Sequence, residues 1–174
     1  MDDVVFNGFL TRQWEEAAPL NQASDLVRIR PFGGTPPNRY VVDFRCTGLV
    51  MNEGGSVAES DRFRVGIWFP SDYLRRVNPF EVLTWLWPPH VFHPNISDVA
   101  PLICIGRLTR GTPLVEIVYR VFDVITFNNV TMVEHDALNR RACVWARENR
   151  GRFPVDRRPL KRRTLDLTVT SKPS

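Results

Sequence analysis

Residues 93–106 read HPNISDVAPLICIG, and this stretch decides the fold. It opens with a rigid His93-Pro94-Asn95 corner, continues through a short irregular loop and ends with Cys104 inside an apolar Leu-Ile-Cys-Ile run. Position alone leaves two alternatives open for Cys104. It is either core packing, since an unpaired cysteine behaves as a small hydrophobe, or a nucleophile with the Asn95 amide beside it. Position alone slightly favours the core.

The second alternative has a definite chemistry. A cysteine that is loaded by exchange with another thioester needs no general base of its own, but attack of an amine on that thioester creates a tetrahedral oxyanion. The Asn95 amide is a suitable neutral donor to that oxygen, and loss of one such donor typically costs about 10² to 10³ in rate. Asp136 is a candidate carboxylate to orient the amine. An N-cap of the following helix is an equally good interpretation of Asp136, and the two roles are compatible.

Two residues of the corner also have simpler interpretations. A histidine wedged before Pro94 is more typical of a structural donor to the loop backbone than of a general base, so we predict a structural role for His93. Asn95 is typical of a turn residue that closes the loop with its own side chain, and this interpretation prevails until further context is added.

Length and composition bound the remaining possibilities. A chain of 174 residues suits one domain with a substantial core. No apolar run approaches the roughly 18 to 20 residues of a membrane span, and the start, with Asp2 and Asp3, lacks the features of a secretory signal. We therefore expect a cytoplasmic location. The cysteines and histidines do not have the spacing of a zinc site, and no phosphate-binding glycine loop is present, so we expect no metal and no cofactor.

The positive charge is concentrated near the C-terminus. The chain has a formal net charge of +4, but residues 150–163 contain seven Arg or Lys against one Asp, which leaves −2 for the rest. We therefore predict one domain over residues 1–150, whose catalytic role depends on the resemblance described below, and a basic, flexible tail over residues 151–174. The tail lacks interleaved aromatic residues that would stack on bases, and nucleic acid is not an expected partner.

The order of predicted elements indicates an α+β fold. Apolar spacing predicts a first helix from Val5 to Ala18 that ends before Pro19. Alternation then predicts four antiparallel strands, at 27–30, 40–47, 63–69 and 80–87, with a turn at 52–56. Residues 88–113 contain five prolines and predict a long ordered loop, which is usually functional. Two helices follow, one that begins at Thr112 and Pro113, and one from Asp136 to about Asn149.

This order of elements, taken with the His-Pro-Asn corner and the cysteine, resembles a ubiquitin-conjugating enzyme over roughly residues 5–150. HPNI at 93–96 and ICI at 103–105 are similar to the family's motif and active-site segment. Supporting similarities are WFPSDY at 68–73, NPFEVLTW at 78–85 and EHDAL at 134–138.

The resemblance implies roles and partners. Cys104 would form the thioester, Asn95 would stabilise the oxyanion, His93 would shape the loop and Asp136 would position the incoming amine. The implied partners are ubiquitin or a ubiquitin-like protein, an activating enzyme, and a ligase or target protein, with no membrane involved. A silent scaffold of the same fold that only binds the modifier is the alternative. A cysteine hydrolase is remote, because the chain order offers no matching nucleophile motif.

The sequence also departs from the family pattern. The interval from His93 to Cys104 is one residue longer than usual, and Ala100 and Pro101 stand where a glycine is usual before the cysteine. Leu74 replaces the usual proline after Tyr73, and no fourth helix is predicted. These departures point to a divergent, bacterial or viral, member, for which a role in defence against phage is a further expectation.

Overall fold

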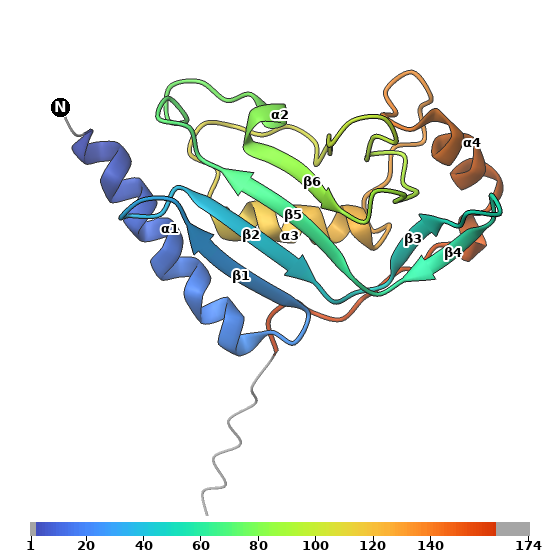
Figure 1. Cartoon of the computed structure of the whole chain (residues 1–174), viewed down its shortest axis with the longest axis horizontal. Helices are drawn as coiled ribbons and strands as arrows, with labels where there is room; N and C mark the ends of the chain where they lie inside the picture. Colours follow the sequence, from blue (N-terminus) through green and yellow to red (C-terminus); the bar gives the residue numbers. More distant parts are fainter. Residues whose placement is uncertain (1–2, 163–174) are drawn as a thin grey trace, which may run out of the picture.

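The computed structural model describes residues 3–162 and has the predicted α+β fold, with an N-terminal helix, a four-stranded antiparallel sheet and helices after the sheet (Figure 1). The sheet has the order β1-β2-β5-β6. Its strands are β1 (Val27–Phe32), β2 (Arg39–Phe44), β5 (Phe63–Trp68) and β6 (Leu83–Trp87). The helices are α1 (Val4–Ala23), α2 (Pro79–Val82), α3 (Leu114–Ile125) and α4 (Arg140–Glu148).

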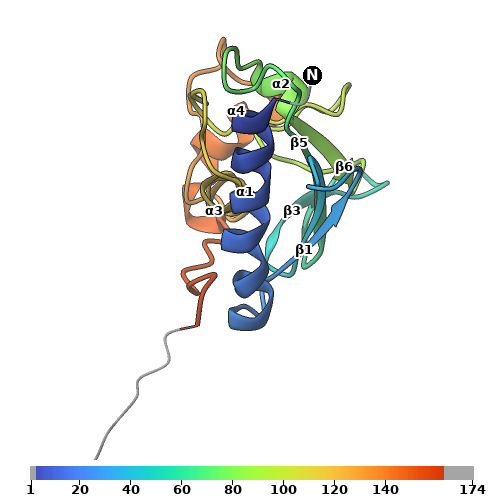
Figure 2. The same ribbon diagram turned by 90° about the vertical axis from the view of Figure 1, so that its left-hand side faces the viewer.

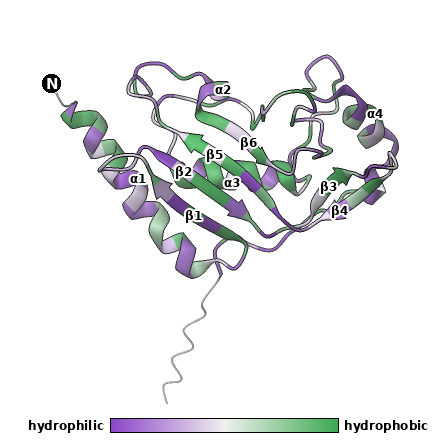
Figure 3. Ribbon diagram, viewed as in Figure 1, coloured by the Kyte–Doolittle hydropathy of each residue, from purple (hydrophilic) through white to green (hydrophobic). Residues whose placement is uncertain are grey.

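The sheet has one covered face and one open face. Helices α1 and α3 lie on the same side of the sheet, and the strands present their other side to solvent (Figure 2). The strands alternate accordingly between buried apolar and exposed polar residues (Figure 3). Helix α3 buries seven of its twelve residues, which makes it the central element of the core.

A second sheet was missed by the sequence patterns. Strands β3 (Gly48–Met51) and β4 (Val57–Ser60) form a separate two-stranded hairpin around the predicted turn at 52–56. The turn itself has Gly55 at φ +75°, a conformation that suits glycine. The hairpin escaped prediction because Gly48–Met51 is apolar throughout and shows no alternation, so a strand there cannot be distinguished from a loop that packs on the core.

The predicted end of the first helix was wrong. Helix α1 continues through Pro19 to Ala23, and Leu20 beyond the proline is buried. Pro19 removes the hydrogen bond to the carbonyl of Glu15, which lies on an exposed part of the helix where water can replace the donor. Burial of Leu20 therefore outweighs the local cost of the proline.

Two further boundaries also differ from the prediction. The predicted fourth strand at 80–87 begins only at Leu83, because Asn78 caps the short helix α2 by accepting a hydrogen bond from the Phe80 amide. The last helix begins at Arg140 and not at Asp136, and its N-cap is Asn139, whose Oδ1 accepts from the Ala142 amide at 3.0 Å. Asp136 is therefore not a helix cap.

The segment after α4 lies against the body as far as it is described. It contains a short 3₁₀ helix, η1 (Arg150–Arg152), and Leu160 is buried in the main core. The amide of Arg162 donates to the carbonyl of Ala23 at the end of α1, at 2.7 Å. Residues 163–174 of the predicted tail lie outside the described residues, so the boundary between domain and tail stays a prediction.

Gln13 joins α1 to α3. The helix α3 has Pro113 at its N-cap and receives no cap from it, and Thr112, predicted as the cap, bonds to Thr109. The buried Gln13 side chain accepts a hydrogen bond from the Leu114 amide at 2.7 Å instead. A residue 101 positions earlier in the chain thus provides the cap of the central helix.

Substitution Gln13→Met tests this link. Methionine has a similar shape but no acceptor, so the Leu114 amide loses its partner, and we expect the free energy of unfolding to fall by about 1 to 3 kcal/mol. Urea denaturation measures the change. The matched control is Gln22→Met on the exposed side of α1, for which we expect a change within about 0.5 kcal/mol. Equal effects of the two substitutions would contradict the capping role.

Candidate functional site

The His-Pro-Asn corner and Cys104 lie side by side because residues 95–97 and 102–104 form a short antiparallel ribbon. The Cys104 amide donates to the Asn95 carbonyl at 2.8 Å, and the Ser97 amide donates to the Leu102 carbonyl at 3.0 Å. Ile96 and Ile103 form the bridge between these bonds, and both side chains are fully buried. The ribbon therefore anchors the loop that carries Cys104 to the core.

The Asn95 side chain ties this ribbon to a third segment. Its Nδ2 donates to the carbonyl oxygen of Cys104 at 3.1 Å, and its Oδ1 accepts from the Thr131 amide at 2.8 Å. The residue is only 3% exposed. The amide thus faces the main chain of Cys104, and both of its polar atoms have partners.

Cys104 differs from the other two cysteines in its exposure. Cys46 and Cys143 are buried, and burial is the main cause that raises the pKa of each. Cys143 also donates a weak hydrogen bond from Sγ to the Thr131 carbonyl at 3.6 Å. Cys104 is partly exposed. Among the three cysteines, therefore, Cys104 alone is not buried.

His93 bonds to the loop backbone with the opposite polarity to the one predicted. Its Nδ1 accepts a hydrogen bond from the Asn95 amide at 3.0 Å, so it is not a donor to the loop. The ring is 1% exposed and packs edge-on against Phe127, with 4.2 Å between ring centroids. Nε2 has no partner among the described residues. Burial lowers the pKa of His93 to about 3, so the ring is neutral and can serve as the acceptor.

Asp136 is not brought into contact with the other predicted residues. Its side chain is 64% exposed, and its one side-chain interaction within residues 3–162 is with Nε2 of His135 at 3.4 Å. The loop that carries it nevertheless connects Thr131 and Asn139, which both contact the corner. The role of Asp136 stays a prediction.

Three supporting residues were missed by the sequence analysis. The Asn139 amide donates to the Pro94 carbonyl at 3.2 Å, and the Trp85 amide donates to the Pro101 carbonyl at 2.9 Å. Thr131 contributes its main-chain amide to Asn95. These are all backbone donors, for which a side-chain pattern offers no signal. Only Asn139 carries a sequence signal, because asparagine is a favoured N-cap residue and it stands directly before α4.

Residues 3–162 contain no group of three or more His, Cys, Asp or Glu that could hold a metal ion. No helix in the same range is long and apolar enough to cross a membrane.

The neutral state of His93 predicts a pH dependence of stability. The unfolded chain protonates this ring near pH 6.5, whereas the folded protein does not until about pH 3. The unfolded state therefore binds more protons in this window, and the free energy of unfolding falls as the pH drops from about 7 to about 5, with a slope that approaches 1.4 kcal/mol per pH unit.

Urea denaturation across that range measures the slope. We expect His93→Gln, which keeps an acceptor for the Asn95 amide but does not titrate, to remove most of it. His135→Gln, at an exposed position, is the control and should leave the slope unchanged. Wild type and His93→Gln with the same slope would contradict the buried neutral ring.

Comparisons with known proteins place the fold. No model of a known protein family matches the chain, and no significant match was found among curated proteins. The search of solved structures found a ubiquitin-conjugating enzyme domain from Toxoplasma gondii, with a TM-score of 0.50 and 18% identity over 81% of this chain and 88% of that one. It also found the human ubiquitin-conjugating enzyme E2 G1, with a TM-score of 0.48 and 19% identity over 67% of this chain and 90% of that one.

The agreement with the Toxoplasma domain extends over most of both chains. It includes the first helix, the four-stranded sheet and the later helices that the sequence predicted. The chain has the fold of the ubiquitin-conjugating enzymes.

Proposed function

We propose that the protein is a conjugating carrier, which accepts the C-terminus of ubiquitin or a ubiquitin-like protein as a thioester on Cys104 and transfers it to an amine of a target. The observation that carries this proposal is the partly exposed Cys104, whose main chain forms two hydrogen bonds with the buried Asn95. The fold shared with a ubiquitin-conjugating enzyme domain supports it.

Loading is an exchange of thioesters. The Cys104 thiolate attacks the carbonyl carbon that links the modifier to the cysteine of an activating enzyme. A new carbon–sulfur bond forms, the old one breaks, and the activating enzyme leaves as a thiolate that takes up the proton. This step needs no general base from the chain. That suits the site, since the histidine of the motif, His93, is buried with a lowered pKa that makes it a weak base, and its Nδ1 already accepts from the Asn95 amide.

Transfer is aminolysis. The neutral amine nitrogen of a lysine attacks the thioester carbon, and the carbonyl oxygen becomes an oxyanion. Collapse of the intermediate expels the Cys104 thiolate, which takes up the proton that the nitrogen loses. Asn95 Nδ2 carries two hydrogens, and only one bonds to the Cys104 carbonyl. The other is the donor that we assign to the oxyanion. Asp136 is the proposed positioning residue for the amine, because its exposed carboxylate can hold the lysine ammonium near the site before it loses the proton and attacks.

The proposed partners follow from the same function. They are ubiquitin or a ubiquitin-like modifier, its activating enzyme, and a ligase or target protein. The alternative is a silent scaffold of the same fold, which binds a modifier without a covalent bond, and the experiments below separate the two.

A loading assay tests the carrier. The protein is incubated with a modifier and activating enzyme from the same genome and ATP, and is then run on gels with and without reductant. We expect an adduct that reductant removes from wild type, an ester that resists reductant from Cys104→Ser, and no adduct from Cys104→Ala. Cys46→Ala is the control and should load normally, because that thiol is buried. No adduct with this cognate pair, while the modifier still binds, would favour the scaffold.

A second experiment separates the two roles of Asn95. Asn95→Asp keeps an acceptor for the Thr131 amide but removes the donor, so we expect near-normal loading and a transfer rate lower by about 10² to 10³. The loaded protein is chased with free lysine, and thermal unfolding checks that the variant is folded. Transfer at the wild-type rate would mean that Asn95 only supports the loop.

A further inference from the structure

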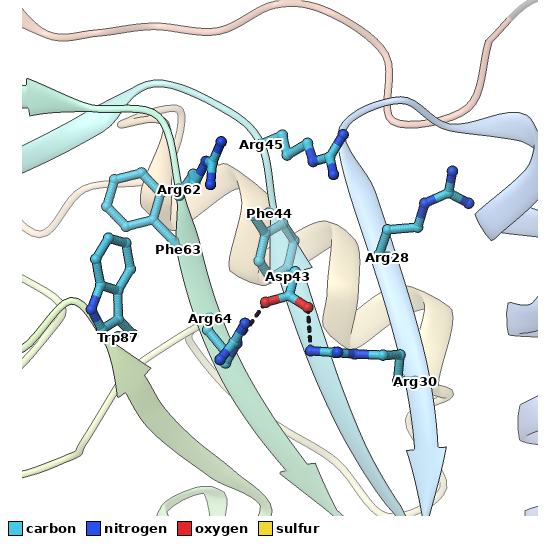
Figure 4. A pocket seen from close by; sticks show the side chains of 9 residues that line it. All are labelled: Arg28, Arg30, Asp43, Phe44, Arg45, Arg62, Phe63, Arg64 and Trp87. Carbon is cyan, nitrogen blue, oxygen red and sulfur yellow. Dashed lines mark hydrogen bonds and ion pairs between the residues drawn. The ribbon is translucent and has the colours of Figure 1, made fainter.

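We propose that the open face of the four-stranded sheet binds single-stranded nucleic acid. This inference is independent of the proposed carrier function and rests on other residues. A hollow of about 490 Å³ lies on this face, at the end of the sheet where β1 begins and β2 ends (Figure 4). Its lining includes Asp43, Trp87 and five arginines, which are Arg28, Arg30, Arg45, Arg62 and Arg64.

The strand register gathers these residues from distant parts of the chain. Asp43 of β2 lies opposite Arg28 of β1 on one side and opposite Arg64 of β5 on the other. Arg64 in turn lies opposite Trp87 of β6. Adjacent strands are about 4.8 Å apart, so this row places cationic and aromatic groups within a few strand widths. Residues that are 59 positions apart in sequence thus share one surface.

The hollow has a large excess of positive charge. Asp43 bridges Arg30 and Arg64, with both ion pairs at 2.6 Å (Figure 4). Arg45 and Arg62 have no hydrogen bond or ion pair from their side chains among the described residues. Arg28 donates to the Asn21 carbonyl of α1. The lining of the hollow thus holds five guanidinium groups and a single carboxylate, which pairs with two of them. Guanidinium groups bind phosphate in a bidentate manner and stack on aromatic faces, which suits a chain of phosphates and bases.

Exposed aromatic side chains continue the same face. Trp87 is 45% exposed and borders the arginine hollow, whereas Trp68 and Phe32, at 37% and 48%, lie toward the other end of the strands. The guanidinium of Arg39 lies 5.3 Å from the centroid of the Trp68 ring. A second hollow of about 220 Å³ there includes Phe32, Trp68 and Arg39 in its lining.

The arginines and the exposed aromatic side chains of this face together indicate the class of ligand. An acidic peptide would pair with the arginines but would leave the exposed tryptophans without a function. A single strand offers both phosphates and unpaired bases, and each base that stacks on an aromatic ring adds to the affinity without sequence preference. A duplex keeps its bases stacked on one another and cannot use the tryptophans in this way.

This proposal departs from the expectation drawn from the sequence. Nucleic acid was not an expected partner, because the chain without residues 150–163 has a net charge of −2 and the basic tail lacks interleaved aromatic residues. That sum averages over the whole surface, whereas the alternation of three strands places their arginines on one side of the sheet.

Fluorescence anisotropy with the full chain tests the proposal. The probe is a labelled single strand of about 15 nucleotides, within the range for one small domain, titrated at several salt concentrations from about 50 to 200 mM. We expect the variant Arg45→Glu/Arg62→Glu to bind at least about tenfold more weakly. The slope of log affinity against log salt should also fall by about 1.4, which corresponds to two lost phosphate contacts. We expect Trp87→Ala to weaken binding at least about fivefold.

The matched control is Arg12→Glu/Arg141→Glu, which makes the same change in charge at exposed positions on α1 and α4. It should bind within about twofold of wild type. Equal losses in both double variants would overturn the proposal, because binding would then follow net charge or the basic C-terminal residues. Binding that Trp87→Ala does not weaken, or a matched polyglutamate peptide that binds as tightly as the oligonucleotide, would also overturn it in favour of an acidic protein partner.

Discussion

The structure depends on how the buried main-chain amides and carbonyls of residues 91–97 find hydrogen-bond partners. All seven are buried, yet they form no regular helix or strand, so each amide and carbonyl must find a partner outside the usual ladders. The His-Pro-Asn corner meets this demand by residue type. Histidine provides a neutral acceptor for the Asn95 amide, proline removes a donor that would otherwise be buried, and asparagine provides one donor and one acceptor for two other segments.

The partners of the corner determine the arrangement around Cys104. The main chain of Thr131 is held at both of its polar groups, by Asn95 at the amide and by the Cys143 thiol at the carbonyl. Phe127, which has a left-handed φ of 59°, packs against His93 and belongs to a small second core. The hairpin β3–β4 contributes Leu49 to the same core. The loop that carries Cys104 is therefore supported by segments from both halves of the chain, although only the corner itself is visible as a motif.

The parts of the fold that could be predicted are those with a strong local signal. The apolar stripe of α3 and the alternation of apolar and polar residues in β1, β2 and β5 predicted these elements correctly, because each element buries one face against the same core. The errors arose where tertiary contacts outweigh local preference. Burial of Leu20 carries α1 past Pro19, and contact of the Asn139 amide with Pro94 sets the start of α4 later than Asp136. The proximity of Asn95 and Cys104 was predicted, but their backbone partners have no side-chain signature.

The cap that Gln13 gives to Leu114 has a consequence for synthesis of the chain. During translation α1 emerges first, but the amide that pairs with Gln13 appears only after about a hundred further residues. The contacts of Arg162 at the other end of α1 come later still. The nascent helix can pack on β1 early, because Asn21 bonds to both the amide and the carbonyl of Ile29. The part of the helix that contacts α3 lacks its partner until the second half of the chain is made. A chain that stops before Arg162 leaves the carbonyl of Ala23, at the C-terminal end of the first helix, without this partner.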